Sequence, residues 1–508
     1  MTQKIIFFGL DGGTWTKLDK FMSQGIMPNL TSILQRGVRS VLQSTFPYTS
    51  RTSWISMLTG TNPGKHGIPH YIVGGKQEVP SIWEKLSDAK IKCIVVHDVV
   101  TYPPLPIDGI MISGGFSTPS KSTNFVHPTN LMSEINDVAD GYVSNLDPIT
   151  TKKVRDGHYD EFFESLQEYA EKITRTTLYL GNKFDWQVLA VTLENADYLH
   201  HYFWDKDSYL ERFYSWLDKK LGEFYSFASS HNANLLVGSD HGFGPLKKHF
   251  LINTWLEQTG LGSFGRPSTV RKYLANTRIK TDFAVKSLSR LHLRGLASKV
   301  IPAKIKQVIP IEQNESAYID YSSKAYNSTY NEITINEKDP NEYEKLREKI
   351  IKKLLELRDD GTPVVLEAHK REEVYHGPYV ERAHDIIYLL NNGYRSETRF
   401  RENYLLTSDE LGLNHSGDHR PEGIFIAVGP DIEENKVLES VPKIFDVFPT
   451  MLHMTNQPIP SYVDGKVIQE IFKKSSPLYN KKILISKENE KDFIKNRISK
   501  MKKLKLYR

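Results

Sequence analysis

Acidic and imidazole side chains that could bind divalent metal ions occur at four separated places in the sequence. Asp197 and His201 are four residues apart, so a helix would place both on one face, where they could hold one ion. Asp240 and His241 are adjacent and, in a tight turn, could bind one ion or two neighbouring ions. Imidazole and carboxylate together suit borderline-soft divalent cations such as zinc. The complete candidate set is Asp11, Asp197, His201, Asp240, His241 and His419.

A group of hydroxyl residues supplies candidate nucleophiles. These residues run directly into an apolar, helix-like segment at 54–58: Thr49, Ser50, Thr52 and Ser53. A hydroxyl at the N-terminus of a helix lies where backbone N–H groups and the helix dipole favour negative charge, which suits an alkoxide and can hold a phosphate. Capping of the helix by a Ser or Thr side chain is the commoner use of such residues. The metal-ligand candidates elsewhere in the chain favour the nucleophile.

Six candidate ligands and one hydroxyl are enough to hold two ions with open coordination positions. Two ions roughly 3.5–4 Å apart are a known arrangement for phosphoryl displacement, because they lower the pKa of the nucleophile and stabilise charge on the phosphoryl oxygens. The sequence holds 17 histidines, so any one histidine alone is weak evidence for a ligand. We regard the following imidazoles as decoys or as supports of the ligands: His66, His70, His97, His200, His249, His384 and His415.

The elements that must position these residues are those of an α/β fold with a parallel sheet. Residues 4–10 are rich in β-branched and aromatic types and alternate little, which is typical of a strand buried on both faces. Asp11 follows this strand directly, and the other acidic or imidazole groups also follow expected strands. Open α/β sheets place ligands at the carboxyl ends of their strands. Further strands are expected at 38–43, 91–97, 186–193, 234–238, 364–366, 385–390 and 423–428.

Helices and loops are expected between these strands. The amphipathic or capped segments predict helices at 28–37, 81–90, 160–180, 207–230, 341–358 and 445–454. Residues 102–123 are rich in Pro, Gly and Ser and are therefore expected to form a loop.

The expected domain organisation is one large core with an insertion. We expect the core to comprise residues 1–258 and 322–475, and residues 259–321, with many Lys and Arg, to form an inserted, mostly helical cap. A basic cap could attract an anionic substrate, although a solvated basic face is the commoner explanation. Residues 476–508 form a Lys-rich tail, which could be a surface helix that makes weak contact with a membrane surface.

Composition excludes several classes of protein. A net charge of +5 over 508 residues is too mild to indicate nucleic-acid binding. The single cysteine, Cys93, excludes disulfides within this sequence and any Cys-rich zinc site. No run approaches the roughly 18 apolar residues of a membrane span. The N-terminal apolar run is about six residues long and ends at Asp11, unlike a secretory signal. We therefore expect a cytoplasmic protein.

Several motifs of the sequence form a set. They are FFGLDGG (7–13), TSRTSWISMLTGTNPGKHGI (49–68), LENADYLHH (193–201), GSDHGFGP (238–245), GDHRPEGIFIAVGP (417–430), and FDVFPTML (445–452) with DGKVI (464–468). In this order they resemble the type I phosphodiesterase / nucleotide pyrophosphatase family of the alkaline phosphatase superfamily, and they span nearly the whole chain. The resemblance implies an alkaline-phosphatase-like fold, with a central, mostly parallel sheet, helices on both faces and an inserted cap.

The resemblance also implies roles for individual residues. It assigns one ion to Asp11, Ser50, Asp240 and His241, and the other to Asp197, His201 and His419. The catalytic hydroxyl falls on Ser50, eleven positions before Gly60 when counted inclusively, and Thr49 is the alternative. The family often has Thr at this position. Zinc is the expected ion and manganese the alternative, because the ligands suit both.

The chain departs from the family in the residues that bind phosphate. Many nucleotide pyrophosphatases use an Asn near the nucleophile to hold the phosphoryl oxygen, and no such Asn is evident around Ser50. His70, Tyr71 or a backbone N–H could replace it. Arg51, beside the nucleophile, is a candidate phosphate clamp, and no clear counterpart of the arginine that favours monoesters in alkaline phosphatases is evident. Nucleotide specificity is therefore left open.

The function implied is that of a metal-dependent phosphohydrolase. Ser50 would form a phosphoseryl intermediate during cleavage of a phosphodiester or pyrophosphate bond. The substrate would be a small phosphorylated molecule, such as a nucleotide, a nucleotide-sugar, or a glycan or lipid phosphodiester. A phosphotransferase or mutase of the same superfamily is the alternative. In cofactor-independent phosphoglycerate mutases the last His follows closely after the Asp-His pair, whereas His419 lies far along the chain from His241. A non-catalytic metal-containing binding protein is a third, less favoured candidate.

Overall fold

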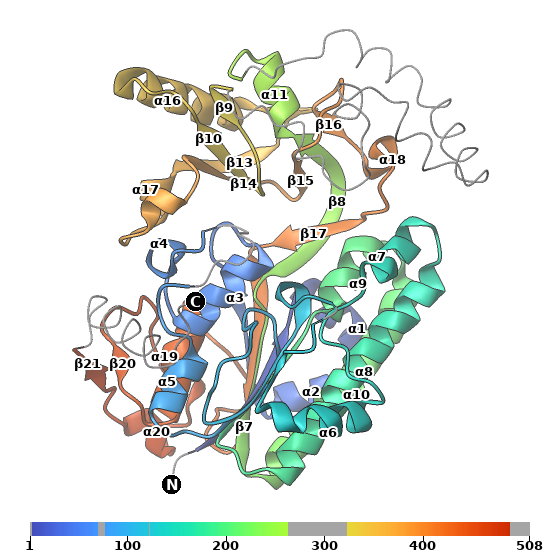
Figure 1. The fold of residues 1–508 in the computed structure, drawn as a ribbon, viewed down its shortest axis with the longest axis vertical. Helices are drawn as coiled ribbons and strands as arrows, with labels where there is room; N and C mark the ends of the chain where they lie inside the picture. The colour runs from blue at the N-terminus through green and yellow to red at the C-terminus, as the bar shows by residue number, and fades with distance from the viewer. Residues whose placement is uncertain (1–2, 70–76, 121, 263–322, 488–508) are drawn as a thin grey trace.

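The computed structural model describes residues 3–69, 77–120, 122–262 and 323–487 (Figure 1). A nine-stranded sheet lies at its centre, in the order β19-β2-β18-β7-β1-β6-β3-β4-β5. Its strands are β1 (Lys4–Leu10), β2 (Gly37–Gln43), β3 (Cys93–Asp98), β4 (Gly109–Ser113), β5 (Val126–His127), β6 (Val188–Leu193), β7 (Ala233–Gly238), β18 (Glu422–Val428) and β19 (Lys436–Val437). Neighbouring strands pair in parallel, except that β18 is antiparallel to β2 and β7, and β5 to β4. The predicted fold class is confirmed.

The sheet is buried because helices cover both of its faces. Along β1 the side chains alternate between two hydrophobic clusters, with Ile6, Phe8 and Leu10 in one and Ile5 and Phe7 in the other. The first cluster packs against α1 (Trp15–Ser23), α2 (Pro28–Gln35), α6 (Met132–Ala139), α7 (Pro148–Arg155), α8 (Tyr159–Lys183), α9 (Asn195–Phe203) and α10 (Asp207–Ser230). The second packs against α3 (Ser50–Thr59), α5 (Ile82–Asp88), α19 (Val447–Met454) and α20 (Pro477–Asn480), which lie on the opposite side in Figure 1. A continuous apolar run therefore fits a strand that has no solvent-facing side.

A second region, residues 250–262 and 323–406, is built on a separate hydrophobic cluster, and we call it the upper region. Its four-stranded sheet has the order β13-β14-β10-β9, and α16 packs against β13 (Figure 1). Its elements are α11 (Ile252–Gln258), β9 (Ala325–Tyr326), β10 (Glu332–Ile335), α16 (Pro340–Glu356), β11 (Arg358–Asp359), β12 (Thr362–Pro363), β13 (Val365–Lys370), α17 (Arg371–Val374), β14 (Ile386–Leu390), β15 (Gly393–Glu397) and β16 (Leu405–Leu406).

One long strand joins the two regions. β8 (Gly242–Leu251) begins directly after His241 and runs from the edge of the central sheet into the upper region (Figure 1). Its first residues, 242–245, pair antiparallel with β17 (Gly417–Arg420), and its later residues pair in parallel with β15 and antiparallel with β16. Nearby lie α4 (Pro63–His66) and α18 (Ser408–Leu411), and β20 (Ile459–Pro460) pairs with β21 (Ile485–Ser486) near the C-terminus. The backbone of β8 therefore links the edge of the central sheet to the upper region.

The structure differs from the sequence predictions at two places in the central sheet. The predicted loop at 102–123 contains β4, a buried strand that pairs with β3 and β5. The helix predicted at 28–37 ends at Gln35, and Gly37 instead begins β2. A Cβ on Gly37 would lie 2.3 Å from the Ala427 carbonyl oxygen, so glycine permits the close approach of β2 to β18.

The predicted domain division stays a prediction. Of the expected cap at 259–321, only residues 259–262 are described, and the tail beyond residue 487 lies outside the described residues. Within the described part of the chain, no helix is both long and apolar enough to cross a bilayer.

Candidate active site

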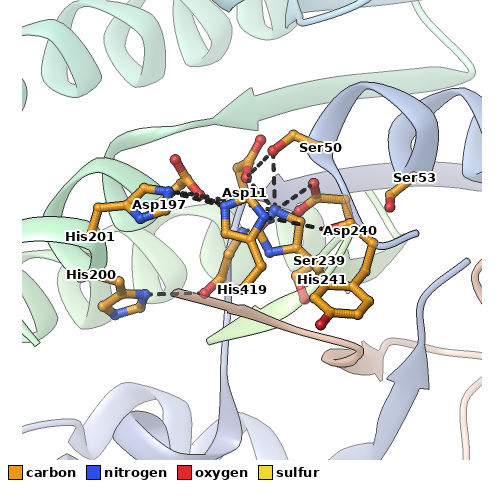
Figure 2. Close-up of polar contacts among 12 residues, drawn as sticks. Asp11, Ser50, Ser53, Asp197, His200, His201, Ser239, Asp240, His241 and His419 are labelled. Carbon is orange, nitrogen blue, oxygen red and sulfur yellow. Dashed lines mark hydrogen bonds and ion pairs between the residues drawn. The ribbon is translucent and has the colours of Figure 1, made fainter. Parts of the chain in front are cut away.

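The candidate ligands come together because they follow neighbouring parallel strands. Asp11 follows β1, Asp197 lies in the first turn of α9 just after β6, and Asp240 and His241 follow β7. β6, β1 and β7 are adjacent in the sheet, so their carboxyl ends lie at one edge. His419 arrives from β17, whose register pairs His419 with Phe243, two residues after His241. Figure 2 shows all of these side chains in one group.

One end of the group surrounds Ser50. Ser50 Oγ lies 3.1 Å from His241 Nε2 and 3.5 Å from Asp11 Oδ1. His241 Nε2 is also 3.5 Å from Asp11 Oδ1 and 3.3 Å from Asp240 Oδ2. Asp11, Asp240 and His241 are all buried, and their ligand atoms are close enough to share one metal ion.

The other end of the group contains two imidazoles and one carboxylate. His419 Nε2 lies 3.1 Å from Asp197 Oδ1 and 3.0 Å from His201 Nε2, while His201 Nε2 is 3.6 Å from Asp197 Oδ1. Asp197 and His201 thus share one face of α9, as their spacing predicts. Asp197 Oδ1 is 3.9 Å from His241 Nε2, which joins the two ends of the group. Asp197, His241 and His419 form a second set of atoms that could share an ion.

Backbone carbonyl groups orient the three histidines. His201 Nδ1 lies 3.2 Å from Gly417 O, His241 Nδ1 lies 3.1 Å from Gly242 O, and His419 Nδ1 lies 3.3 Å from Tyr48 O. A carbonyl oxygen only accepts hydrogen bonds, so Nδ1 of His241 and Nδ1 of His419 carry the proton and donate it. Nε2 of these two residues therefore presents a lone pair to the centre of the group, which is the tautomer a metal ligand requires. His201 Nδ1 lies between the accepting Gly417 O and the donating Arg395 Nη1 at 3.3 Å, so these two contacts favour opposite tautomers of His201.

The electrostatics of the group disfavour its charged forms while no cation is present. Burial, followed by repulsion from Asp240 and Asp197, raises the pKa of Asp11. Burial also raises the pKa of Asp240. The pKa of His241 is lowered by burial and by the nearby His419, and the pKa of His201 is lowered by burial and by Arg395. Neutral imidazoles beside clustered carboxylates are the donors that a divalent cation requires.

Unpaired oxygen atoms support the same fit. Asp197 Oδ1 and Asp240 Oδ2 are buried, and no described residue donates a hydrogen bond to either atom. A buried carboxylate oxygen without a partner is costly, and a cation would remove that cost. His201 Nε2 and His419 Nε2 face each other at 3.0 Å, a separation that suits two ligands of one ion. The residues present therefore fit divalent metal ions.

The helix that carries Ser50 begins at Ser50 itself. Its N-cap residue, Thr49, has extended backbone and makes no capping hydrogen bond, and Thr49 Oγ1 is buried without a partner. Capping by Thr49 therefore does not account for the hydroxyl cluster. One turn later Trp54 Nε1 donates to Asp11 Oδ2 at 2.9 Å. A Cβ on Gly9 would lie 2.7 Å from the Trp54 ring, so glycine leaves the space that this ring occupies.

The predicted substrate contacts have different outcomes. Arg51 lies on α3 directly after Ser50 and is half-buried. His70 and Tyr71 lie outside the described residues, so their proposed contacts with phosphate stay predictions.

Sequence reasoning missed several side chains beside the group. Trp54 orients Asp11, and Asp418, adjacent to His419, accepts a hydrogen bond from Tyr330 and pairs with Arg395. Asp418 lies inside the GDHR motif, so its position next to His419 was a usable signal. Arg395 and Tyr330 belong to the upper region and lie in none of the motifs, so the sequence carried no signal for them.

Comparison with known proteins identifies the family. The family model of type I phosphodiesterase / nucleotide pyrophosphatase matches residues 5–419, which is most of the chain. The chain belongs to this family. It is therefore an enzyme of the phosphodiesterase and nucleotide pyrophosphatase type within the alkaline phosphatase superfamily. A search of curated proteins finds no match to this sequence.

Solved structures of the same fold include human ectonucleotide pyrophosphatase / phosphodiesterase 5, with TM-score 0.50, 14% identity, and coverage of 90% of this chain and 95% of that chain. Phosphonoacetate hydrolase from Sinorhizobium meliloti 1021, in complex with phosphonoformate, has TM-score 0.52 and 16% identity over 90% of this chain and 95% of that chain. An inactive variant of murine ectonucleotide pyrophosphatase / phosphodiesterase 5, in complex with AMP, has TM-score 0.52 and 14% identity. This match covers 93% of this chain and 100% of that chain. At these identities the likeness shows the fold.

Proposed function

We propose that this family member is a metal-dependent phosphohydrolase that cleaves a phosphodiester or pyrophosphate bond through a phosphoserine at Ser50. The observation that carries the proposal is the position of Ser50 Oγ, 3.1 Å from His241 Nε2 and 3.5 Å from Asp11 Oδ1. A hydroxyl at the start of a helix, facing a buried group of metal-ligand atoms, is poised to act as a nucleophile.

The ligand assignment follows the two ends of the group. One divalent ion would be held by Asp11, Ser50, Asp240 and His241, and the other by Asp197, His201 and His419. We propose zinc, with manganese as the alternative, because imidazole and carboxylate suit both. When bound, such ions lower the pKa of a nucleophilic hydroxyl and stabilise charge on phosphoryl oxygens.

The residues of the chain set the direction of the reaction. Ser50 Oγ attacks phosphorus, and a P–O bond to Ser50 forms as the bond to the leaving oxygen breaks in line with it. The leaving alcohol or phosphate therefore departs on the side opposite Ser50, where Asp197, His201 and His419 lie. Water then attacks phosphorus from that side, which releases the phosphorylated product and restores the Ser50 hydroxyl. The first turn of α3 favours negative charge near Ser50 throughout.

A small phosphorylated molecule is the proposed substrate. A nucleotide is favoured because a structure of the same fold, the murine phosphodiesterase 5 variant, is in complex with AMP. Nucleotide-sugars and glycan or lipid phosphodiesters are the other classes, and the Lys-rich tail would contribute at most a weak membrane-surface contact. We propose that the protein acts in the cytoplasm.

The proposed function is tested with the Ser50→Ala variant and a substrate panel of bis-p-nitrophenyl phosphate, p-nitrophenyl phosphate and UDP-glucose. We expect the wild-type enzyme to cleave the diester faster than the monoester, and Ser50→Ala to lose at least about 10³-fold in kcat while it keeps its fold and metal. Ser53→Ala is the matched control, because Ser53 Oγ contacts Ser44 Oγ at 3.0 Å. Full activity of Ser50→Ala would remove Ser50 from the mechanism.

A further inference from the structure

Arg395 contacts the candidate metal centre but belongs to the upper region. It lies on β15, where it pairs with His249 of β8. Its Nη1 atom is 3.3 Å from His201 Nδ1 and 3.2 Å from Asp418 Oδ1. The Arg395 side chain is 19% exposed, while the Asp418 side chain is 3% exposed. The upper region therefore places a guanidinium group directly behind a candidate metal ligand.

Asp418 holds one edge of the guanidinium, and among the described residues the other edge has no partner. Asp418 pairs with Nη1 and is itself held by the Tyr330 hydroxyl, whose ring lies 5.5 Å from the guanidinium. Within the described part of the chain, no hydrogen bond or ion pair involves the Nε or Nη2 atom of Arg395. The edge formed by these two atoms is the planar fork that binds an oxyanion through two parallel hydrogen bonds.

Besides Asp418, the Glu397 carboxylate of the same strand acts electrostatically on Arg395. His249 and His415 lie near the guanidinium, and burial followed by the charge of Arg395 lowers the pKa of both, to about 4 for His249. Among the residues that the structure describes, His415 Nδ1 is buried and has no hydrogen-bond partner. Its ring centroid lies 5.7 Å from that of His201. Arg395 thus supplies a guanidinium group at the His201 end of the candidate metal centre.

Arg395 also lies on the side where the leaving group departs. Ser50 contacts Asp11 and His241 at one end of the ligand group, and Arg395 contacts His201 at the other end. Figure 2 shows Ser50 and His201 on opposite sides of the group. In-line displacement requires the leaving oxygen to lie opposite the nucleophile. A group attached to that oxygen would therefore extend towards Arg395.

We propose that Arg395 binds a second anionic group of the substrate, a phosphoryl group carried by the leaving group. The enzyme would then prefer pyrophosphate-linked substrates, in which a phosphate departs, over simple diesters, in which an alcohol departs. This inference rests on the proposed function and specifies its substrate class. The ion pair with Asp418 anchors the guanidinium, and Tyr330 holds Asp418 in place. Charge-assisted hydrogen bonds to a phosphoryl group give roughly 10- to 100-fold in affinity.

A binding experiment tests the subsite without turnover. Methylenediphosphonate carries two phosphoryl groups and methylphosphonate carries one, and calorimetry measures the affinity of the metal-loaded protein for each. We expect the wild-type protein to prefer the diphosphonate and Arg395→Gln to lose roughly 10- to 100-fold for the diphosphonate alone. Arg358→Gln is the matched control, because Arg358 is an exposed arginine of the same region. Equal losses for both probes, or no loss for either, would overturn the proposal.

A kinetic experiment measures the same preference during turnover. The measured quantity is the ratio of kcat/KM for UDP-glucose to kcat/KM for bis-p-nitrophenyl phosphate. This ratio should fall roughly 10- to 100-fold in Arg395→Gln. It should fall less in Arg395→Lys, which keeps the positive charge but not the planar fork. Metal content is measured in each variant, because Arg395 contacts His201. An unchanged ratio would overturn the subsite. If the wild-type enzyme cleaved no phosphoester, the proposed function would fail, and the phosphonate affinities would still decide the subsite.

Discussion

The central sheet and the upper region supply different parts of the candidate active site. The sheet contributes Asp11, Asp197 and Asp240 from the ends of adjacent parallel strands, so their convergence follows from strand order. The upper region contributes Arg395 and Tyr330 from a separate layer with its own hydrophobic cluster. Our proposals accordingly assign the chemistry to the sheet edge and the selection of the substrate to the upper region.

The two regions are also joined by β8, whose pairing with β15 fixes where Arg395 lies relative to the central sheet. β8 begins at the site and continues into the upper region, so Arg395 is held in register with His249 by strand pairing. A second connection joins α4 to the loop after α17, where Tyr379 N donates to Gly64 O at 2.9 Å. His376 Nε2 also lies 3.0 Å from Asp464 Oδ1. The proposed subsite residue Arg395 therefore lies on a paired strand rather than on a free loop.

The largest effect is expected from removing a carboxylate of the central sheet. Asp197 Oδ1 lies between His419 and His241, so Asp197→Ala should reduce bound metal and lower kcat/KM by at least about 10³-fold. Inductively coupled plasma mass spectrometry measures the metal per chain. Asp207→Ala, at an exposed carboxylate on α10, is the control and should keep both properties. Unchanged metal content in Asp197→Ala would contradict the ligand assignment.

A smaller loss is expected from the residue that orients Asp11. Trp54→Phe removes the indole N–H that donates to Asp11 Oδ2, and hydrogen-bond partners of metal ligands typically account for roughly 10- to 100-fold in metal affinity or activity. Competition with a chelator measures the affinity. Trp216→Phe is the matched control, because its indole donates to Glu171 at 3.0 Å far from the site. An equal effect in both variants would assign Trp54 a packing role only.

The upper region should respond with a change of specificity instead. Tyr330→Phe removes a hydrogen bond to Asp418 and loosens the anchor of Arg395, so we expect about a threefold to tenfold loss on UDP-glucose and little loss on bis-p-nitrophenyl phosphate. Metal content should stay unchanged. Tyr343→Phe, which removes a hydroxyl that donates to Asp385 at 2.6 Å in the same region, is the control. Loss of metal in Tyr330→Phe would place this tyrosine with the chemistry rather than with recognition.

The smallest expected effect is the dependence of folding stability on pH. The sign of this dependence should differ between a buried histidine of the central region and a buried glutamate of the upper region. Burial lowers the pKa of His66, in α4, to about 3, so the unfolded chain binds a proton below pH 6.5 that the folded chain does not, and stability falls as the pH drops from 6.5 towards 3. Burial raises the pKa of Glu332, in β10, to about 8. The folded chain keeps that proton while the unfolded chain loses it above pH 4.5, so stability falls as the pH rises from 4.5 towards 8.

Urea unfolding of two variants from pH 5 to pH 8 measures these slopes. Each group should contribute at most about 1.4 kcal/mol per pH unit, so His66→Gln should flatten the acid side of the profile and Glu332→Gln the alkaline side. For each variant, the slope of unfolding free energy against pH is compared with the wild-type slope, because the two regions need not unfold together. Equal slopes in both variants and the wild type would contradict the burial of these groups.

Much of the site was predictable because strand ends are readable in a sequence. The apolar run of β1 ends at Asp11, and the runs of β6 and β7 end near Asp197 and Asp240, so a parallel sheet must bring the three together. The strand β4 was missed because the residues around it are rich in Pro, Gly and Ser. Its own sequence, GIMIS, is apolar and is buried between β3 and β5.

The sequence by itself determined the candidates for the chemistry of this protein: the side chains that could bind metal, the serine at a helix start and the parallel strands that bring them to one edge. These features depend on local patterns, because a strand ends where its apolar run ends and a helix starts at its first turn. Only the tertiary structure decided which residues surround that chemistry. The pairing of β8 with β15 and β17 brings Arg395 and Asp418 to His201. Such long-range register depends on the packing of the whole chain, and no short stretch of sequence encodes it.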